Sequence, residues 1–364
     1  MIETHLSLLL VVIPLLAAPV AAILPNGRLP WLLTQLVSWL CFALAIWQFL
    51  LVMDGNVISY ELGGWAPPWG IEYRIDTVHA FVALIVAGMA AITLPYAMLS
   101  VEQEIAKDKL SLFYATFLLC MDGLLGITLT GDIFNLFVFL EISSLSTYAL
   151  ISMGRQRRAL TAAYQYLIMG TIGATFLLIG IGLIYAETGT LNMTDLSARL
   201  PAVFEHRTVH TAFAFIVVGV GLKLAMFPLH LWLPNAYTYS PSAVTVFLAA
   251  TATKVAVYVM LRLVFTVFSI GFAYVTPTDD MFMLVGALGV IVASIYAIYQ
   301  QDAKRLLAYS SVAQIGYILM GIGFGSALGL TASVLHIFNH ALMKGALFMA
   351  VGALVYRIGN SQIS

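Results

Sequence analysis

Charged residues are scarce in this sequence. Asp, Glu, Lys and Arg make up 9% of the 364 residues, whereas hydrophobic residues make up 62%. Ordinary soluble domains contain about a quarter charged residues. So few charges cannot form the surface of a water-soluble protein of this length, so lipid must cover most of it. The sequence therefore predicts an all-α, multi-pass protein of the cell (inner) membrane.

The sequence also has few cysteines, almost no net charge and no basic residue before its first apolar run. The two cysteines, Cys41 and Cys120, lie inside apolar runs, which excludes a disulfide framework and a CxxC metal site. A net charge of −1 argues against nucleic acid as a partner. The first apolar run is preceded by Glu3 and by no Lys or Arg, so we expect an uncleaved first span. No haem, flavin or iron–sulfur ligation pattern is visible, so we expect no cofactor and no redox centre in this chain.

Eleven apolar runs are long enough to cross a bilayer, which takes roughly 20 residues. Residues 54–76 carry paired glycines and prolines between β-prone stretches and predict a hairpin on the membrane face. Residues 187–210 are polar with scattered leucines and predict a short interfacial helix. The expected spans are 6–24, 30–53, 77–99, 110–130, 133–153, 161–186, 211–229, 242–268, 281–300, 304–324 and 327–357.

The distribution of Lys and Arg among the connecting segments predicts the orientation. Cytoplasmic loops are enriched in these residues. With the N-terminus outside, nine basic residues fall on the cytoplasmic side and three on the outer side. We therefore expect the N-terminus outside. The cytoplasmic set is Arg28, Lys107, Lys109, Arg155, Arg157, Arg158, Lys304, Arg305 and Arg357, and the outer set is Arg74, Arg199 and Arg207.

Three ionisable residues stand deep inside expected spans. At 1.5 Å per residue, Glu141 lies about 12 Å into its helix, and Lys223 and Lys254 each lie about 18 Å into theirs. A charge at the bilayer centre costs about 2.5–3.5 kcal/mol on insertion scales. We therefore expect the three to lie near one another or near water and to relay protons or cations. The alternative is a static Glu141–Lys223 ion pair that only locks two helices together.

A proline-rich interruption follows the first of these lysines. Pro228, His230 and Pro234 come shortly after Lys223. A proline inside a helix removes a backbone hydrogen bond and kinks the axis. Broken helices with ionisable residues mark ion sites in transporters, so His230 joins the candidate residues.

Three other charged residues have weaker patterns. Asp122 lies near the middle of its span, where a cation site and a helix–helix hydrogen bond fit equally well. Asp132 precedes the next span and is typical of an N-cap. Arg262 lies some two turns beyond Lys254, from where its long side chain can reach the membrane surface.

The last span carries a stripe of titratable residues. His336, His340 and Lys344 are spaced by four and share one helical face. A His-x-x-x-His pair can bind metal, but Lys344 would repel a divalent cation and no Cys or carboxylate completes a site. Histidine titrates near physiological pH, so the pattern favours a proton path. Two core histidines without such a role remain the alternative.

Four segments carry a resemblance to a known superfamily. They are GDIFNLFVFLE (131–141), KLAMFPLHLWLPNAY (223–237), QDAKRLLAYSS through QIGY (301–317) and HIFNHALMKGALF (336–348). Together they resemble the antiporter-like subunits of respiratory complex I, of energy-converting hydrogenases and of Mrp-type cation/proton antiporters. The first segment is most similar to the D-type subunit of the Mrp antiporters.

The resemblance implies a fold of about fourteen helices with two inverted five-helix repeats, each containing a broken helix. Within one membrane domain, 6–109 would form the N-terminal helices, 110–268 the first repeat and 281–364 an incomplete second repeat. We expect the sequence to be a fragment, because it ends before the second broken helix. Asn235 stands where many relatives carry an acid.

The resemblance also orders the candidate residues. It implies that Glu141 pairs with Lys223 and that Lys254 passes the proton toward the central axis. The path would continue through His336, His340 and Lys344.

The function implied is that of a membrane subunit of an Mrp-type multisubunit antiporter, which exchanges protons for Na⁺ or K⁺ together with other membrane subunits. The alternative is a proton-pumping subunit of an NADH:quinone oxidoreductase or energy-converting hydrogenase, with the redox centres in partner chains. A third hypothesis is an assembly scaffold with a vestigial path. The intact Glu141, Lys223 and Lys254 argue against it.

Overall fold

Long apolar helices account for most of the computed structural model, which describes residues 2–363. Among these residues, eleven helical segments are long and apolar enough to span a membrane, as predicted. The all-α, multi-pass class is therefore confirmed. The long helices are α1 (Ile2–Ile23), α2 (Arg28–Val52), α3 (Thr77–Glu104), α4 (Leu110–Leu129), α5 (Ile133–Ser152), α6 (Arg157–Thr188), α8 (Arg207–Leu224), α10 (Ser242–Ala250) with α11 (Ala252–Arg262), α12 (Thr278–Ile298), α13 (Ala303–Gly323) and α14 (Ala327–Ile358).

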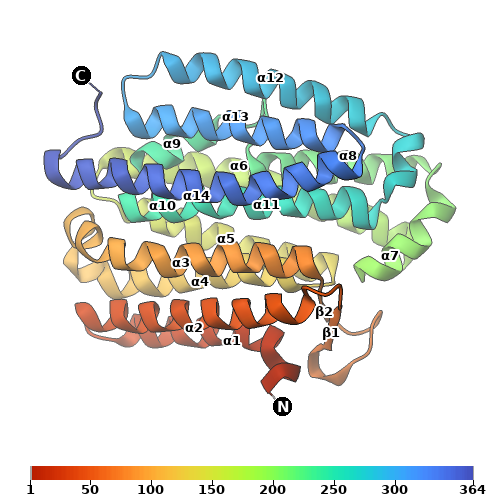
Figure 1. Cartoon of the computed structure of the whole chain (residues 1–364), viewed down its shortest axis with the longest axis horizontal. Coiled ribbons are helices and arrows are strands. Elements are labelled where there is room, and N and C mark those ends of the chain that lie inside the picture. The colour runs from red at the N-terminus through yellow and green to blue at the C-terminus, as the bar shows by residue number, and fades with distance from the viewer. Residues whose placement is uncertain (1, 364) are drawn as a thin grey trace.

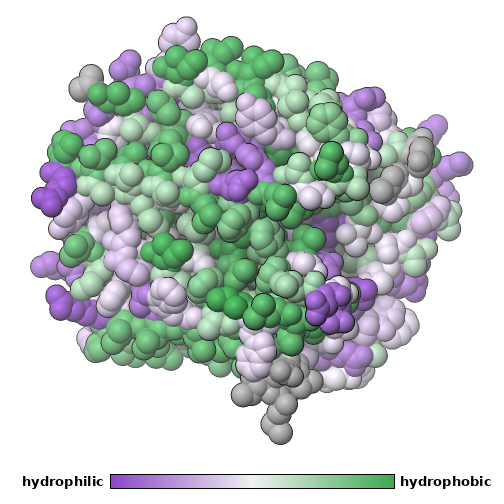
Figure 2. All heavy atoms as spheres, in the orientation of Figure 1, coloured by the Kyte–Doolittle hydropathy of each residue, from purple (hydrophilic) through white to green (hydrophobic). Residues whose placement is uncertain are grey.

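The helices lie side by side with their axes roughly aligned (Figure 1). Helices α1 and α2 pack on α4 and α3, α3 packs on α10 and α14, and α12 packs on α13 at the far edge. The surface in Figure 2 is mostly hydrophobic across the middle of the bundle, with hydrophilic residues gathered toward its two ends. This distribution is the one that a lipid belt requires.

One end of the bundle carries the predicted hairpin and interfacial helix (Figure 1). Strands β1 (Ile58–Glu61) and β2 (Glu72–Ile75) pair antiparallel, with Ile58 opposite Ile75. Helix α7 (Met193–Arg199) lies at the same end, because Asn192 Nδ2 donates to Glu72 Oε2 over 2.9 Å. We call this end the hairpin face and the other end the opposite face.

The seventh span is broken, as its prolines predicted. Helix α8 ends at Leu224, and Ala225 adopts the left-handed conformation (φ 61°, ψ 44°). A short helix α9 (Trp232–Tyr239) then completes the crossing. The segment expected as one helix over 242–268 is also kinked, since Thr251 (φ −123°, ψ −59°) separates α10 from α11. After α11, a π-helical turn η4 (Leu263–Val267) leads to the short helix η5 (Ile270–Tyr274).

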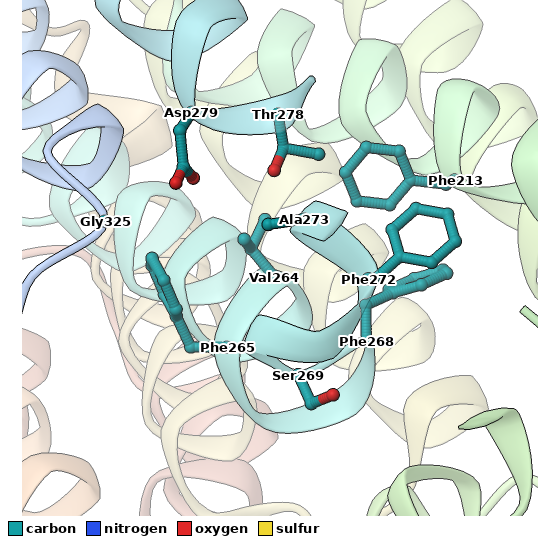
Figure 3. A pocket seen from close by; sticks show the side chains of 10 residues that line it. All are labelled: Phe213, Val264, Phe265, Phe268, Ser269, Phe272, Ala273, Thr278, Asp279 and Gly325. Carbon is teal, nitrogen blue, oxygen red and sulfur yellow. The ribbon is translucent and has the colours of Figure 1, made fainter. Parts of the chain in front are cut away.

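Aromatic side chains pack tightly around the segment after α11 and leave almost no space between them. Figure 3 shows Phe213, Phe268 and Phe272 close together and Asp279 of α12 near the Gly325 loop. The space between them is only about 10 Å³. A water needs about 10–15 Å³, so this site is essentially filled by the protein.

Several helix pairs approach so closely that only glycine fits between them, and α6–α8 and α12–α13 are two of these pairs. A Cβ on Gly219 of α8 would lie 2.6 Å from the Gly173 carbonyl oxygen of α6. A Cβ on Gly316 of α13 would lie 2.6 Å from the Gly286 carbonyl oxygen of α12. Small residues permit such backbone contacts between membrane helices, and they fix α6 to α8 and α12 to α13.

Candidate functional site

The buried acid and the first buried lysine meet. Lys223 Nζ donates to Glu141 Oε1 over 2.9 Å and to Ser144 Oγ over 2.8 Å. The Lys223 side chain is 5% exposed and that of Glu141 25%. Ser144 lies three residues after Glu141, on the same face of α5, and this spacing was the signal by which the sequence could have identified it.

The helix break places Lys223 in the last turn of α8. There the Trp232 indole donates to the Leu222 carbonyl over 2.8 Å, and the Met226 amide donates to the Gly221 carbonyl over 2.9 Å. The indole stacks on Tyr166, with ring centroids 3.8 Å apart. Non-helical backbone is tolerated in a membrane only where such partners satisfy it. The C-terminal end of a helix also favours a cation, so the break creates a site for the ammonium group.

A small cavity connects this pair with α11. Its volume is about 30 Å³, and Lys223, Ser144 and Thr147 line one side while Ala252 and Val255 line the other. This volume exceeds what one water requires. A water held here has hydroxyl and ammonium partners, so it can accept a proton from Lys223.

Lys254 lies beyond that cavity, in contact with the histidine stripe. Its Nζ is 3.3 Å from His340 Nε2 and also donates to the Ala249 carbonyl, which the kink at Thr251 exposes. Both Lys254 and His340 are fully buried. The structure thus joins α11 to α14 through two titratable groups.

The other members of the stripe contact α13. Lys344 Nζ donates to Ser310 Oγ over 2.9 Å and to the Leu307 carbonyl over 3.0 Å. His336 Nε2 is 2.7 Å from Gln314 Oε1, and the His336 and His340 rings stack 6.2 Å apart. We call Lys254, His336, His340 and Lys344 the central cluster. The described residues contain no group of three or more His, Cys, Asp or Glu side chains that could hold a metal.

His230 lies in the break between α8 and α9 and faces α13. Its ring stacks on Phe227 with centroids 5.5 Å apart and meets Tyr309 edge-on at 6.4 Å. Its buried Nδ1 has no hydrogen-bond partner in the described residues. Tyr309 is adjacent to Ser310, so His230 lies between the broken helix and the residues that hold Lys344.

Asp122 makes no hydrogen bond to Glu141, Lys223 or the central cluster. Both carboxylate oxygens are buried and without a hydrogen-bond partner in the part of the chain that the structure describes. Asp122 lies instead toward the hairpin, where burial and then its carboxylate raise the pKa of the Tyr73 phenol. The sequence placed Asp122 within a span but could not show which neighbours its helix face would have.

The other two charged residues have structural partners. Asp132 caps α5, because its Oδ1 accepts from the Asn135 amide over 2.7 Å. The expectation that Arg262 reaches the membrane surface is wrong, since its side chain is buried and its guanidinium donates to the Thr130 carbonyl. That carbonyl follows the end of α4 and offers an acceptor inside the protein.

A polar vestibule opens at the opposite face. Its volume is about 330 Å³, and Glu104 and Lys304 are among the residues lining it. Lys304 Nζ donates to the Ser240 carbonyl over 3.2 Å, and Glu104 Oε2 accepts from the Ser242 amide over 2.8 Å. These two side chains hold the turn between α9 and α10. Lys304 also lies one turn before Leu307, which contacts Lys344.

The chain matches a known family of membrane proteins. A family model described as "NADH:quinone oxidoreductase/Mrp antiporter, TM" matches residues 130–364. The chain is 43% identical to the N subunit of the NADH-quinone oxidoreductase of Desulforudis audaxviator, over 99% of this chain and 72% of that protein. It is 28% identical to the D-type subunit of the Na⁺/H⁺ antiporter of Alkalihalophilus pseudofirmus, over 86% of this chain and 62% of that protein.

A solved structure shares the fold. The Mrp complex from Dietzia sp. DQ12-45-1b contains a chain that matches with a TM-score of 0.90 and 29% identity, over 100% of this chain and 66% of that one. The present chain thus spans between 62% and 72% of the length of these relatives.

Proposed function

We propose, because this chain belongs to the NADH:quinone oxidoreductase/Mrp antiporter family of transmembrane proteins, that it carries protons across the cell membrane as one subunit of a multisubunit complex. The observation that carries the proposal is the succession of buried ionisable groups from Glu141 and Lys223 to the central cluster. Buried charges in a membrane are costly and mark ion or proton paths.

In this path, the Glu141–Lys223 pair controls the release of the proton from Lys223. The carboxylate 2.9 Å away stabilises the charged ammonium in a site that otherwise disfavours charge. When Glu141 moves away, Lys223 yields its proton to water in the 30 Å³ cavity beside it. Lys254 accepts the proton on α11, and His340, 3.3 Å from its ammonium, continues the line.

The vestibule supports proton intake from the opposite face. It has room for water at the first turn of α13, where Lys304 donates to the Ser240 carbonyl. Leu307, one turn along that helix, contacts Lys344 of the central cluster. Movement of the α9–α10 turn would break the hydrogen bond from Lys304 to the Ser240 carbonyl, which couples intake to the broken helix.

The relatives support two alternative driving forces for proton transport by this chain. The 43% identity to a quinone oxidoreductase subunit ranks a redox-driven complex first. The 28% identity to a Na⁺/H⁺ antiporter subunit and the match to an Mrp complex support cation/proton exchange. Either way, other membrane subunits are partners, and the proton path within this chain is the same.

The experiment that tests the proposal uses membrane vesicles containing the complete complex and a pH-sensitive dye. Proton movement started by an electron donor and a quinone, without dependence on Na⁺ or K⁺, assigns the redox-driven complex. Proton movement started by Na⁺ or K⁺ without a donor assigns the antiporter. Absence of proton movement under both conditions, in vesicles with the assembled complex, contradicts the proposal.

We further propose that the N-terminus and the hairpin face lie outside. The nine-to-three distribution of basic residues supports this orientation. The test compares Glu61→Cys on the hairpin with Lys107→Cys at the opposite face, both exposed positions, while the native cysteines are buried. On intact cells, an impermeant maleimide should label only the first variant. Labelling of only the second would reverse the orientation.

A further inference from the structure

A second cavity with titratable walls lies at the hairpin face, away from the residues assigned above. Its volume is about 190 Å³. A water needs about 10–15 Å³ of such space, so the cavity has room for several waters. The N-terminus of α3, the C-terminal part of α11 with η4, and the start of α14 form its walls. The titratable residues lining it are Asp76, His79, Tyr258 and Arg262.

Asp76 orients the His79 ring in this cavity. Asp76 Oδ1 caps α3 by accepting from the Val78 and His79 amides, and it lies 2.5 Å from His79 Nδ1. Burial opposes ionisation of Asp76, but the hydrogen bonds from His79 outweigh it and lower the pKa of Asp76 to about 2. The carboxylate is therefore ionised at physiological pH and accepts a hydrogen bond from Nδ1–H, which leaves Nε2 as the free proton acceptor.

The free nitrogen of His79 has no competing partner. His79 Nε2 is buried and accepts no hydrogen bond in the described part of the chain. A buried imidazole nitrogen beside a cavity large enough for water can exchange a proton with that water.

Charged groups of both signs lie near His79: the Asp76 carboxylate contacts its ring, and Arg262 of α11 lines the same cavity. The Tyr258 ring meets the His79 ring edge-on, with centroids 5.6 Å apart.

The cavity approaches the central cluster from the hairpin side. Tyr258 lies four residues, about 6 Å along the axis, from Lys254 on α11. Helix α14 likewise contributes Val334 to the cavity wall and His340 to the cluster. The Tyr258 ring lines the cavity on this side, and its hydroxyl donates to the Thr128 carbonyl over 3.1 Å.

We propose that this cavity is a proton port at the hairpin face, in which His79 exchanges protons between the water of the port and the central cluster. The proposal rests on the proton-carrying function proposed above. It adds a residue and an opening that the line from Glu141 to Lys344 does not contain.

The test replaces His79 with Asn in the complete complex. Asn keeps an amide donor for Asp76 but cannot carry a proton. Vesicle proton transfer should fall by about 100-fold, the usual contribution of a positioned acid–base group. The remaining rate should no longer depend on the pH at the hairpin side. The matched control is His206→Asn, which removes a histidine 3.0 Å from Glu187 on the same face but 54% exposed, and should leave transfer unchanged.

A second measurement does not depend on the folding of the His79 variant. Thr266 is exposed and lines the port. In Thr266→Cys, an impermeant thiol reagent should block transfer when added at the hairpin side and not when added at the opposite side. Normal transfer in His79→Asn with unchanged pH dependence, or no block of Thr266→Cys, would overturn the port. If Glu141→Gln is inactive in the same vesicles, only the port fails; if it is active, the proposed function fails first.

Discussion

Proton translocation should fall by about 100-fold or more when Glu141 is replaced by Gln, with the complex still assembled. The substitution keeps the shape of the side chain but removes the charge 2.9 Å from Lys223 Nζ. Lys223 is 5% exposed, and leaving a buried charge without its partner costs about 3–5 kcal/mol. The ammonium is then lost as a proton carrier. Dye-based proton transfer in vesicles, with subunit content checked by immunoblot, measures the effect.

The matched control for this variant is Glu102→Gln. Glu102 is an exposed acid near the end of α3, so its neutralisation should leave transfer at the wild-type rate. Lys223→Ala should be as inactive as Glu141→Gln, and the double variant no worse than either, because the two residues act as one unit. Full transfer in Glu141→Gln or in Lys223→Ala would reduce the pair to a static link between α5 and α8.

Lys254→Met should also abolish translocation, by interrupting the line between the first pair and the histidines. Methionine fills similar space in a fully buried site but carries no proton. His340 then loses the only titratable group within hydrogen-bond distance of its Nε2 among the described residues. Loss of transfer by about 100-fold is expected. Stopped-flow proton release from vesicles, with the thermal stability of the complex as a check on folding, measures it.

Lys109→Met serves as the control for that variant, because it removes an exposed lysine at the opposite face. His340→Gln should resemble Lys254→Met, since Gln can hydrogen-bond to Lys254 without accepting its proton. Transfer above half the wild-type rate in Lys254→Met would show that protons reach α14 by another route, and the proposed order of residues would be wrong.

The cost of burying charge made most of the site predictable from sequence. Glu141, Lys223 and Lys254 are singled out because mid-span charges are expensive, and the structure gives each of them a polar partner. The same argument selected Asp122, which has no hydrogen-bond partner in the described residues. Depth follows from counting residues along a helix. The neighbours of a side chain depend on helix rotation, which the sequence of one span does not contain.

The fold was predictable where hydropathy or proline carries the signal. All eleven spans and the break after Lys223 follow from these patterns. The kink at Thr251 has no such signal, because threonine keeps its backbone amide and is common in membrane helices. The bond from Asn192 to Glu72 joins residues 120 positions apart, and no local pattern specifies it. The Asp76–His79 pair was missed because an N-cap and a histidine three residues later look ordinary in sequence.

The glycine contacts between α6 and α8, and between α12 and α13, decide where this bundle can flex. Helices whose backbones are in direct contact cannot slide past each other without collision, so we expect each pair to move as one rigid unit. Elsewhere, the left-handed Ala225 and the kink at Thr251 interrupt the regular helices. These interruptions lie two residues after Lys223 and three residues before Lys254. We therefore expect any rearrangement that accompanies proton transfer to begin beside the two lysines, while the paired helices stay in place.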